Sequence, residues 1–193
     1  MGRFRESITA DELKTLQLGS FSGEIVVVDH STHMGKMVEL LQNERLLGFD
    51  TETKPSFKKG KKNKLAIIQL STADVCFLIR INSQGVFPEV VNILTNPSIT
   101  KVGISLRDDM AAIHTMLNFK PGGFIDLQQE VVKYGIEDKS LKKLAGLILG
   151  MRISKSQQTS NWEAEVLSDA QKLYAATDAW VCREMYLRLL QTD

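Results

Sequence analysis

Hydrophobic residues follow two different spacings along the chain, and these spacings predict its elements. Short apolar runs between polar or turn residues are typical of strands, and such runs stand at 25–28, 46–51, 65–70, 75–81, 100–104 and 123–126. Apolar residues three and four positions apart predict a helix over 31–42. A Ser or Thr three residues before a Glu or Gln, the capping-box pattern, predicts the beginning of two more helices. These are Thr9-x-x-Glu12 for a short helix over 8–17 and Ser168-x-x-Gln171 for a long helix over 169–190.

The order of these elements predicts an α/β domain with a mixed sheet flanked by helices. The connection over 71–74 is short, so the strands at its two ends should be antiparallel neighbours. From residue 88 onward helices and strands alternate, which is typical of α/β architecture. No repeat, low-complexity tract or linker divides the chain. We therefore expect residues 1–24 to be an N-terminal extension with a short helix, and residues 25–193 to form a single domain.

Composition and charge narrow the class of protein. Lys and Arg number 24 and Asp and Glu number 23, which gives a net charge of +1. This balance excludes a polycation that binds nucleic acid through bulk charge, but it leaves nucleic acid open as a substrate. No apolar stretch approaches the ~20 residues of a membrane helix, and the polar N-terminus predicts no signal peptide. Cys76 and Cys182 stand far apart in apolar surroundings, so we expect two buried, reduced thiols and a cytoplasmic protein.

Asp50 and Glu52 form the first group with candidate chemistry. They end a predicted strand, where side chains two residues apart point to the same face. Two adjacent carboxylates repel each other, so the pair needs a cation or a shared proton. Hard oxygen ligands select Mg²⁺ or Mn²⁺ over zinc. Taken alone, however, the pair favours an ordinary solvated strand end.

Tyr174 and Asp178 form the second group. They stand four residues apart in the long C-terminal helix, so they share one face of it. Their neighbours are small or apolar, which predicts that this stretch packs against the protein and that Asp178 needs a partner there. The alternative is a core tyrosine beside a surface aspartate.

Asp108 and Asp109 form the third group, between a predicted strand and an apolar helix. Aspartates at the beginning of a helix are commonly caps that complement its dipole. Capping explains one of the two, and the other is free to point into a site at the carboxyl end of the strand.

Together, in this order along the chain, the three acidic groups resemble the DEDD superfamily of 3′-5′ exonucleases. Position 173 is Leu and position 174 is Tyr, so the resemblance is to the tyrosine branch, and within it to the ribonuclease D and Werner syndrome helicase exonuclease families. It spans about residues 25–190. Further matching motifs are Asp50-Thr-Glu-Thr, the strand with Gln69, Lys101-Val-Gly-Ile, Phe124-Ile-Asp-Leu127, Ser140-Leu-x-x-Leu144, Ser160-Asn-Trp162 and Leu167-Ser-x-x-Gln171.

The resemblance implies a ribonuclease H-like mixed sheet of five to six strands and hydrolysis of nucleic acid from its 3′ end, with release of nucleoside 5′-monophosphates. It also implies two divalent metal ions, Mg²⁺ or Mn²⁺, which activate a water and stabilise the leaving 3′ oxygen. Asp50 would bridge both ions, Glu52 and Asp178 would complete one site, and Asp109 would hold the second ion. Tyr174 would orient the attacking water. Asp109 aligns with the family position, which leaves Asp108 as the expected cap.

A Lys-rich segment over 54–64, KPSFKKGKKNK, directly follows the strand of Asp50 and Glu52. Beside the metal ions it would hold the phosphate backbone of the substrate, whereas the alternative is a solvated hairpin loop. The polar segment 151–163 offers further cations. The predicted nucleic-acid-binding residues are Lys58, Lys59, Lys61, Lys62, Lys64 and Lys155, with Arg152 as a further candidate.

The aromatic and histidine residues near these motifs have simpler interpretations. Trp162 is expected in the core. His30 and His33 are expected to be ordinary turn and helix-cap residues, because no cysteine or third histidine stands near them.

The predicted partner is therefore the 3′ end of DNA or RNA, without a membrane; no protein partner is predicted. One alternative is a non-catalytic nucleic-acid-binding domain that keeps the exonuclease fold, and another is a metal-dependent nuclease of the opposite polarity. The exonuclease hypothesis predicts an acidic pocket under a basic rim, whereas an evenly mixed surface there would count against it.

Overall fold

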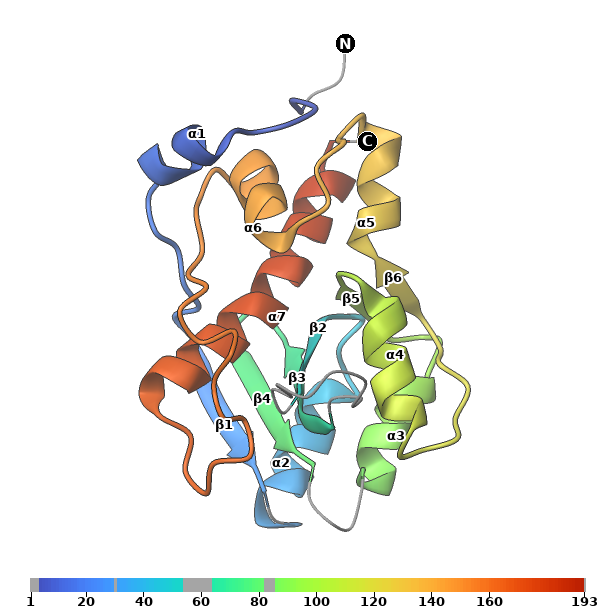
Figure 1. The fold of residues 1–193 in the computed structure, drawn as a ribbon. Coiled ribbons are helices and arrows are strands. Elements are labelled where there is room, and N and C mark those ends of the chain that lie inside the picture. Colours follow the sequence, from blue (N-terminus) through green and yellow to red (C-terminus); the bar gives the residue numbers. More distant parts are fainter. Residues whose placement is uncertain (1–3, 30, 54–63, 82–85, 193) are drawn as a thin grey trace.

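A six-stranded mixed sheet forms the centre of the computed structural model of the protein (Figure 1). The structure describes residues 4–29, 31–53, 64–81 and 86–192. The strands are β1 (Glu24–Val28), β2 (Leu46–Thr53), β3 (Leu65–Ser71), β4 (Val75–Arg80), β5 (Thr100–Gly103) and β6 (Phe124–Asp126), in the order β1-β4-β3-β2-β5-β6. β3 is antiparallel to β2 and β4, and the other neighbouring pairs are parallel. The predicted mixed sheet and antiparallel neighbours are thus confirmed.

Helices pack on both faces of this sheet and beyond its upper end in Figure 1. They are α1 (Ala10–Thr15), α2 (Ser31–Leu41), α3 (Pro88–Thr95), α4 (Leu106–His114), α5 (Leu127–Glu130), the 3-10 helix η1 (Val131–Tyr134), α6 (Leu141–Leu144), the π-helix η2 (Ala145–Leu149) and α7 (Asp169–Leu190). Both predicted capping boxes are present. Thr9 and Glu12 begin α1, and Ser168 and Gln171 begin α7.

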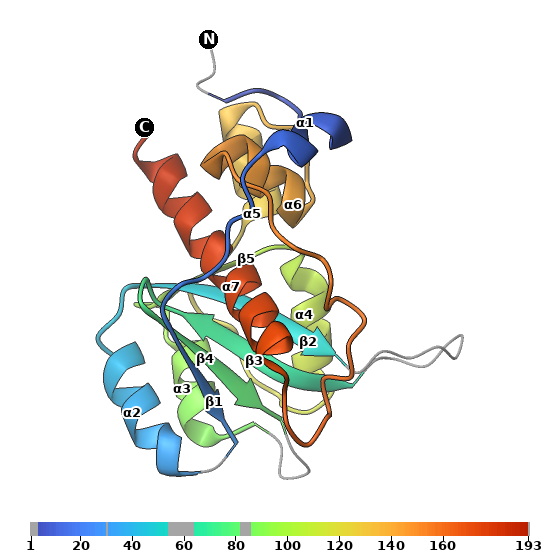
Figure 2. The ribbon, with the colours of Figure 1, turned by 90° about the vertical axis from the view of Figure 1, so that its left-hand side faces the viewer.

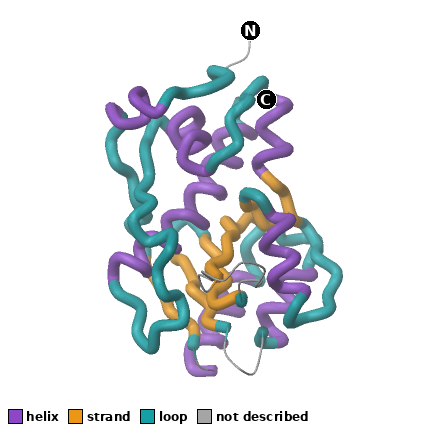
Figure 3. The backbone as a smooth tube through the Cα atoms, in the orientation of Figure 1, coloured by secondary structure: helices purple, strands orange, loops and turns teal. Residues whose placement is uncertain are grey.

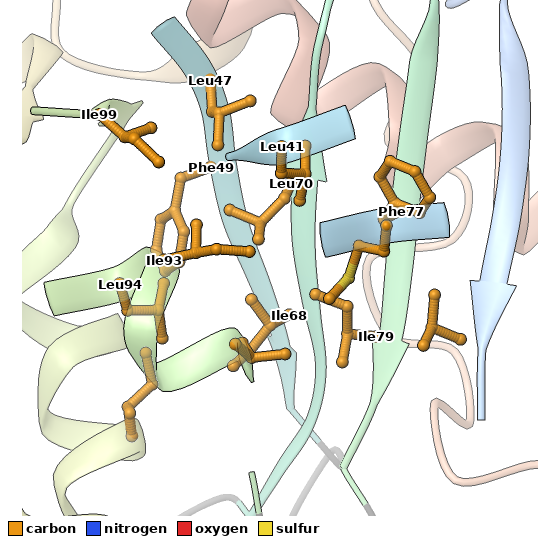
Figure 4. Packing of buried hydrophobic residues seen from close by; sticks show 14 of the residues in the cluster. Leu41, Leu47, Phe49, Ile68, Leu70, Phe77, Ile79, Ile93, Leu94 and Ile99 are labelled. Atoms are coloured by element: carbon orange, nitrogen blue, oxygen red, sulfur yellow. The ribbon is translucent and has the colours of Figure 1, made fainter. Parts of the chain in front are cut away.

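The two faces of the sheet bury different kinds of side chain. The face under α2, α3 and α4 carries large aliphatic and aromatic residues, among them Phe49, Leu70 and Phe77, which interlock with Leu41 and Ile93 from the helices (Figure 4). α7 lies across the opposite face (Figure 2). Figure 3 shows these strands in orange and the helices that cover them in purple. Cys76 and Cys182 are buried and unpaired, as expected.

α7 approaches the sheet unusually closely because small residues stand on both sides of the contact. Ala175, Ala176 and Ala179 of the helix are fully buried against it. Gly48 of β2 lies opposite, and a Cβ at this position would be only 2.0 Å from the carbonyl oxygen of Ala179. The two backbones therefore meet with no side chain between them, which brings the functional groups of β2 and α7 within reach of each other.

The segment before β1 packs against the loops and helices around η2. The Ile8 amide donates to the Asp138 carboxylate at 2.9 Å, and the Gly19 amide donates to the carbonyl of Arg152 at 2.9 Å. Leu13 is buried, and one of its methyl carbons would lie 2.5 Å from a Cβ at Gly146 of η2. Figures 1 and 2 both show α1 beside α6. The N-terminal segment is therefore held against η2 and against the chain just before residues 153–155.

Lys101 fixes the join between α3 and β5. Its side chain is fully buried, and Nζ donates to the carbonyls of Ile93, Asn96 and Ile99 at 3.0, 2.7 and 2.6 Å. Nζ also lies 5.1 Å from the ring centre of Phe124. The ammonium thus satisfies carbonyls at the end of α3 and sets the position of the strand that leads into α4.

Gly48→Ala is expected to destabilise the protein by about 3 kcal/mol, because α7 would have to move away from β2 to admit the new methyl group. The measurement is the free energy of unfolding in urea. Gly35→Ala in α2 is the matched control, since a Cβ there meets nothing within 4 Å. In a helix that change should stabilise by about 0.5–1 kcal/mol. Equal stability of Gly48→Ala and wild type would contradict the close contact.

Candidate active site

Three carboxylates from two distant parts of the chain meet in one pocket. Asp50 and Glu52 extend from the same face of β2, and Asp178 extends from α7 above them. One carboxylate oxygen from each residue lies within 4.8 Å of the other two. Glu52 and Asp178 are buried, with 9% and 6% of their surface exposed. The strand spacing therefore places the first two acids together as expected, and the α7 contact adds the third.

Burial and mutual repulsion make these carboxyl groups reluctant to ionise. Burial raises the pKa of Asp50 well above its usual range, and the charges of Asp178, Asp109 and Glu52 raise it further. Burial, followed by the same neighbours Asp178 and Asp109, raises the pKa of Glu52 to about 9. For Asp178, burial raises the pKa to about 7, although the Tyr174 hydroxyl and the charge of Lys155 act in the opposite direction. A divalent cation among them would relieve this repulsion.

The donor set fits a hard divalent metal ion. Oxygen ligands from several carboxylates are what Mg²⁺ and Mn²⁺ prefer. Within the described residues, Asp50, Glu52 and Asp178 form no salt bridge with a Lys or Arg side chain. Two buried acids and a half-buried third, without a paired cation, are costly unless an ion neutralises them. The site can therefore hold a metal ion.

Asp109 lies on the rim of the same pocket but outside the group of three. The Thr51 hydroxyl donates to its carboxylate. Burial raises its pKa to about 6, and the hydrogen bond from Thr51 lowers it in part. The helix can begin directly after β5 because Ser105 adopts a left-handed conformation, with φ of 56°. This sharp turn places Asp109 one helical turn into α4.

The expectation that Asp108 caps α4 is wrong. Asp126 of β6 takes that role from a neighbouring strand, because its Oδ2 accepts from the Leu106 amide at 3.0 Å. Its Oδ1 accepts from the Gln128 amide at 2.9 Å, so one carboxylate caps two helices. Asp108 is exposed on the rim of the pocket. A cap supplied by a strand that follows later in the chain leaves no local sequence signal.

Tyr174 lies beside Asp178, as the spacing of four residues predicts. Its hydroxyl hydrogen-bonds the Asp178 carboxylate, and burial together with nearby acids raises the tyrosine pKa. The phenol is therefore neutral and acts as a donor. Its ring centre lies 6.0 Å from that of Trp162. Trp162 is 1% exposed, which confirms its predicted place in the core.

The acids lie in an open cavity of about 310 Å³ that also carries two lysines. Lys155 is one of the predicted cations, and Lys142 is a residue that the sequence analysis missed. Lys142 belongs to a short helix whose motif is visible in the sequence, but local spacing does not show that this helix borders the pocket. The cavity is lined by Asp50, Thr51, Glu52, Ile104, Ser105, Asp108, Asp109, Leu141, Lys142, Ile153, Ser154, Lys155, Gln158, Tyr174 and Asp178.

Other predicted cations have different places. Lys58, Lys59, Lys61 and Lys62 lie outside the described residues, so only part of the predicted basic rim is visible. Lys64 lines a separate cavity of about 840 Å³, together with Arg80 and Trp162.

Arg152 and His33 contact backbone carbonyls. The Nε of Arg152 donates to the Leu16 carbonyl at 3.0 Å. His33 Nδ1 lies 3.1 Å from the Val27 carbonyl oxygen, while His30 falls outside the described residues.

Comparison with known proteins identifies the family to which the chain belongs. The model of the 3′-5′ exonuclease family matches residues 25–192, so the chain belongs to that family. A curated relative, the mouse bifunctional 3′-5′ exonuclease/ATP-dependent helicase WRN, is 33% identical over 196 residues, which cover 96% of this chain and 14% of the relative. Ribonuclease D of Gluconacetobacter diazotrophicus is 26% identical, covering 86% of this chain and 42% of the relative. The chain thus spans less than half of these curated relatives, and the resemblance to the tyrosine branch is confirmed.

Solved structures share the fold. The exonuclease domain of Aedes aegypti Nibbler superposes with a TM-score of 0.79 at 23% identity, covering 90% of this chain and 92% of that one. Escherichia coli ribonuclease D gives 0.74 at 21% identity, covering 89% and 45%. Brucella melitensis NrnC bound to pGG gives 0.70 at 26% identity, covering 89% and 82%. The sheet is thus ribonuclease H-like, as predicted. Within the described residues, no helix combines the length and the apolar character needed to cross a membrane.

Asp178→Asn is expected to stabilise the metal-free protein. Because folding raises the pKa of Asp178 from 3.8 to about 7, the folded chain keeps a proton that the unfolded chain releases between these values. The contribution of Asp178 to stability is therefore greatest below pH 3.8 and is lost as the pH rises through 7. At pH 8 the substitution should raise the free energy of unfolding by about 1–3 kcal/mol, and the gain should shrink towards pH 4.

The measurement is urea unfolding in EDTA at both pH values. Asp169→Asn is the control on the same helix, because Asp169 is exposed and pairs with Lys172 at 2.6 Å; that change should not stabilise the protein. A metal-free Asp178→Asn variant no more stable than wild type at pH 8 would show that burying the charge of Asp178 costs the fold nothing.

Proposed function

We propose that the chain hydrolyses phosphodiester bonds at the 3′ ends of DNA or RNA, releasing nucleoside 5′-monophosphates with the help of two divalent ions, Mg²⁺ or Mn²⁺. The observation that carries this proposal is the group formed by Asp50, Glu52 and Asp178, three carboxylates in one pocket without a salt bridge among the described residues. Membership of the 3′-5′ exonuclease family supports this reaction and its polarity.

Each acid has a proposed part in holding the ions. Asp50, Glu52 and Asp178 would hold one ion, and Asp50 would share the second with Asp109, which the Thr51 hydroxyl orients. Bound ions supply Lewis-acid activation and neutralise the charge on the phosphate. The chain supplies the fixed arrangement of oxygen ligands on a strand and two helices.

Tyr174 has a positioning part in this proposal. Its raised pKa keeps the phenol protonated, so it is a hydrogen-bond donor and not a base near neutral pH. Because its hydroxyl already lies at the Asp178 carboxylate, it is placed to orient a water at the edge of the acidic group. It also packs beside Trp162, which limits its motion.

Lys142 and Lys155 provide the proposed contact with the substrate backbone. Both line the acidic cavity, and Lys155 lies close enough to lower the pKa of Asp178. Cations beside the reacting centre hold phosphates in place without reading bases, which suits an enzyme that removes successive nucleotides. One structural relative is described as bound to pGG, which supports a short nucleic acid as a ligand for this pocket.

We propose residues 25–193 as the exonuclease domain.

Asp50→Asn is expected to abolish nucleotide release, because it removes a carboxylate shared by both proposed ions. The assay uses 5′-labelled DNA and RNA oligonucleotides with Mg²⁺ or Mn²⁺, and wild type should produce ladders that shorten from the 3′ end. Loss of more than about 10³-fold is expected, in line with removal of a central electrostatic group. A 3′-blocked substrate should resist, and a 5′-blocked one should not.

The outcomes separate the candidate functions. Binding of the oligonucleotide without hydrolysis would establish the non-catalytic alternative, and resistance of the 5′-blocked substrate would establish the opposite polarity. Release that survives Asp50→Asn would contradict the proposed site.

Lys142→Ala and Lys155→Ala are expected to weaken substrate binding more than turnover. Each should raise KM about 3–10-fold with little change in kcat, and should lower the slope of log affinity against log salt by about one. Lys36→Ala is the control, because Lys36 lies on α2 and pairs with Glu24 at 2.8 Å. Steady-state kinetics at several salt concentrations test this. An unchanged KM in both pocket variants would rule out the backbone contact.

A further inference from the structure

Gln69 is a buried amide next to the acidic group. It stands in β3, where its Cα pairs with that of Asp50 in β2. The side chain is 0% exposed. Among the residues that the structure describes, neither Nε2 nor Oε1 finds a hydrogen-bond partner. Buried amides are almost always hydrogen-bonded, so this one requires an explanation.

The buried amide of Gln171 shows the usual arrangement. Its Oε1 accepts from the Ser168 amide at 3.0 Å, and its Nε2 donates to the Asn161 carbonyl at 3.1 Å. On β3 itself, the Ser71 hydroxyl donates to the Thr72 carbonyl at 2.9 Å. Gln69 thus differs from Gln171 and Ser71 in having no hydrogen-bond partner within the described part of the chain.

The register of the sheet places Gln69 beside Asp50 on the face that α7 covers. Gly48, which pairs with Ser71, faces α7, so residues two positions further along each strand also face α7. Directly paired residues on one face have Cβ atoms about 4.5–5.5 Å apart, and a Gln side chain is long enough to bring its amide to the carboxylate of such a neighbour. Among the strand residues, the ionisable group nearest Gln69 on this face is therefore the Asp50 carboxylate.

The Asp50 carboxylate is a suitable hydrogen-bond acceptor for the Gln69 amide. An ionised carboxylate only accepts hydrogen bonds and has two oxygens. If one oxygen is directed to a metal ion, the other needs a donor that fixes its orientation. Nε2 of Gln69 is such a donor without adding charge, whereas a Lys there would compete with the ion.

We propose that Gln69 is a positioning residue for Asp50, and that its amide donates to the Asp50 carboxylate when that carboxylate holds a metal ion. This inference rests on the proposed function, since it concerns the same metal site. It predicts that Gln69 contributes to metal affinity and not to the stability of the metal-free fold.

The test is Gln69→Met, which keeps the length of the side chain and removes both polar atoms. Mn²⁺ affinity, measured by calorimetry on EDTA-stripped protein, is expected to fall 10–100-fold. The melting temperature in EDTA is expected to stay equal or rise, because an unpartnered buried amide has been removed. Ser71→Ala is the control on the same strand and face, with Mn²⁺ affinity unchanged. Gln69→Leu repeats the test with a different shape.

Kinetics provide a second test, because a residue that only packs in the core would not change how nucleotide release depends on Mn²⁺ concentration. In Gln69→Met the loss of nucleotide release should be large at limiting Mn²⁺ and largely restored at saturating Mn²⁺, while KM for the oligonucleotide stays constant. Wild-type Mn²⁺ affinity in both Gln69 variants overturns the positioning role alone, as does an equal loss in Ser71→Ala. A wild-type chain that binds no Mn²⁺ overturns the proposed function and this inference together.

Discussion

The close contact between α7 and β2 determines the geometry on which the candidate site depends. Gly48 has no side chain, and the carbonyl of Ala179 occupies the space that a Cβ would need. Asp178 precedes that alanine, and Asp50 follows Gly48 by two residues on the same face of the strand. The carboxylates therefore meet because the two backbones meet. A larger residue on either side would separate them, whatever the identity of the acids.

Hydrophobic packing holds this contact against the repulsion of the acids. The C-terminal half of α7 buries Val181, Met185 and Leu189 in a second cluster with η2, and each large apolar side chain contributes about 1.5–3 kcal/mol when fully buried. Burial, together with the charges of Asp178 and Asp109, instead raises the pKa of Glu52, and burial raises the pKa of Asp178. The apolar core keeps the acids close enough to share an ion, at some cost to the stability of the metal-free chain.

Local patterns predicted the elements and pairs of neighbouring residues, but not how distant segments meet. Alternation places Asp50 and Glu52 together, and helical spacing places Tyr174 beside Asp178, because both depend only on the period of one element. The family resemblance joined the two pairs. Nothing local shows that Lys142 borders the pocket or that Arg152 instead holds the N-terminal segment. Those contacts depend on how the helices after β6 pack.

The charges of the pocket favour a metal-dependent enzyme over a domain that only binds nucleic acid. Asp50, Glu52 and Asp178 would repel the phosphates of any nucleic acid that Lys142 and Lys155 attract on the same cavity wall. A domain that only bound nucleic acid would gain affinity from apolar or amide residues at those positions. In the proposed site, two divalent ions would neutralise the four carboxylates, so that phosphate could approach the lysines without repulsion. The same side chains would therefore favour binding only when metal is present, which is also the condition for the proposed hydrolysis.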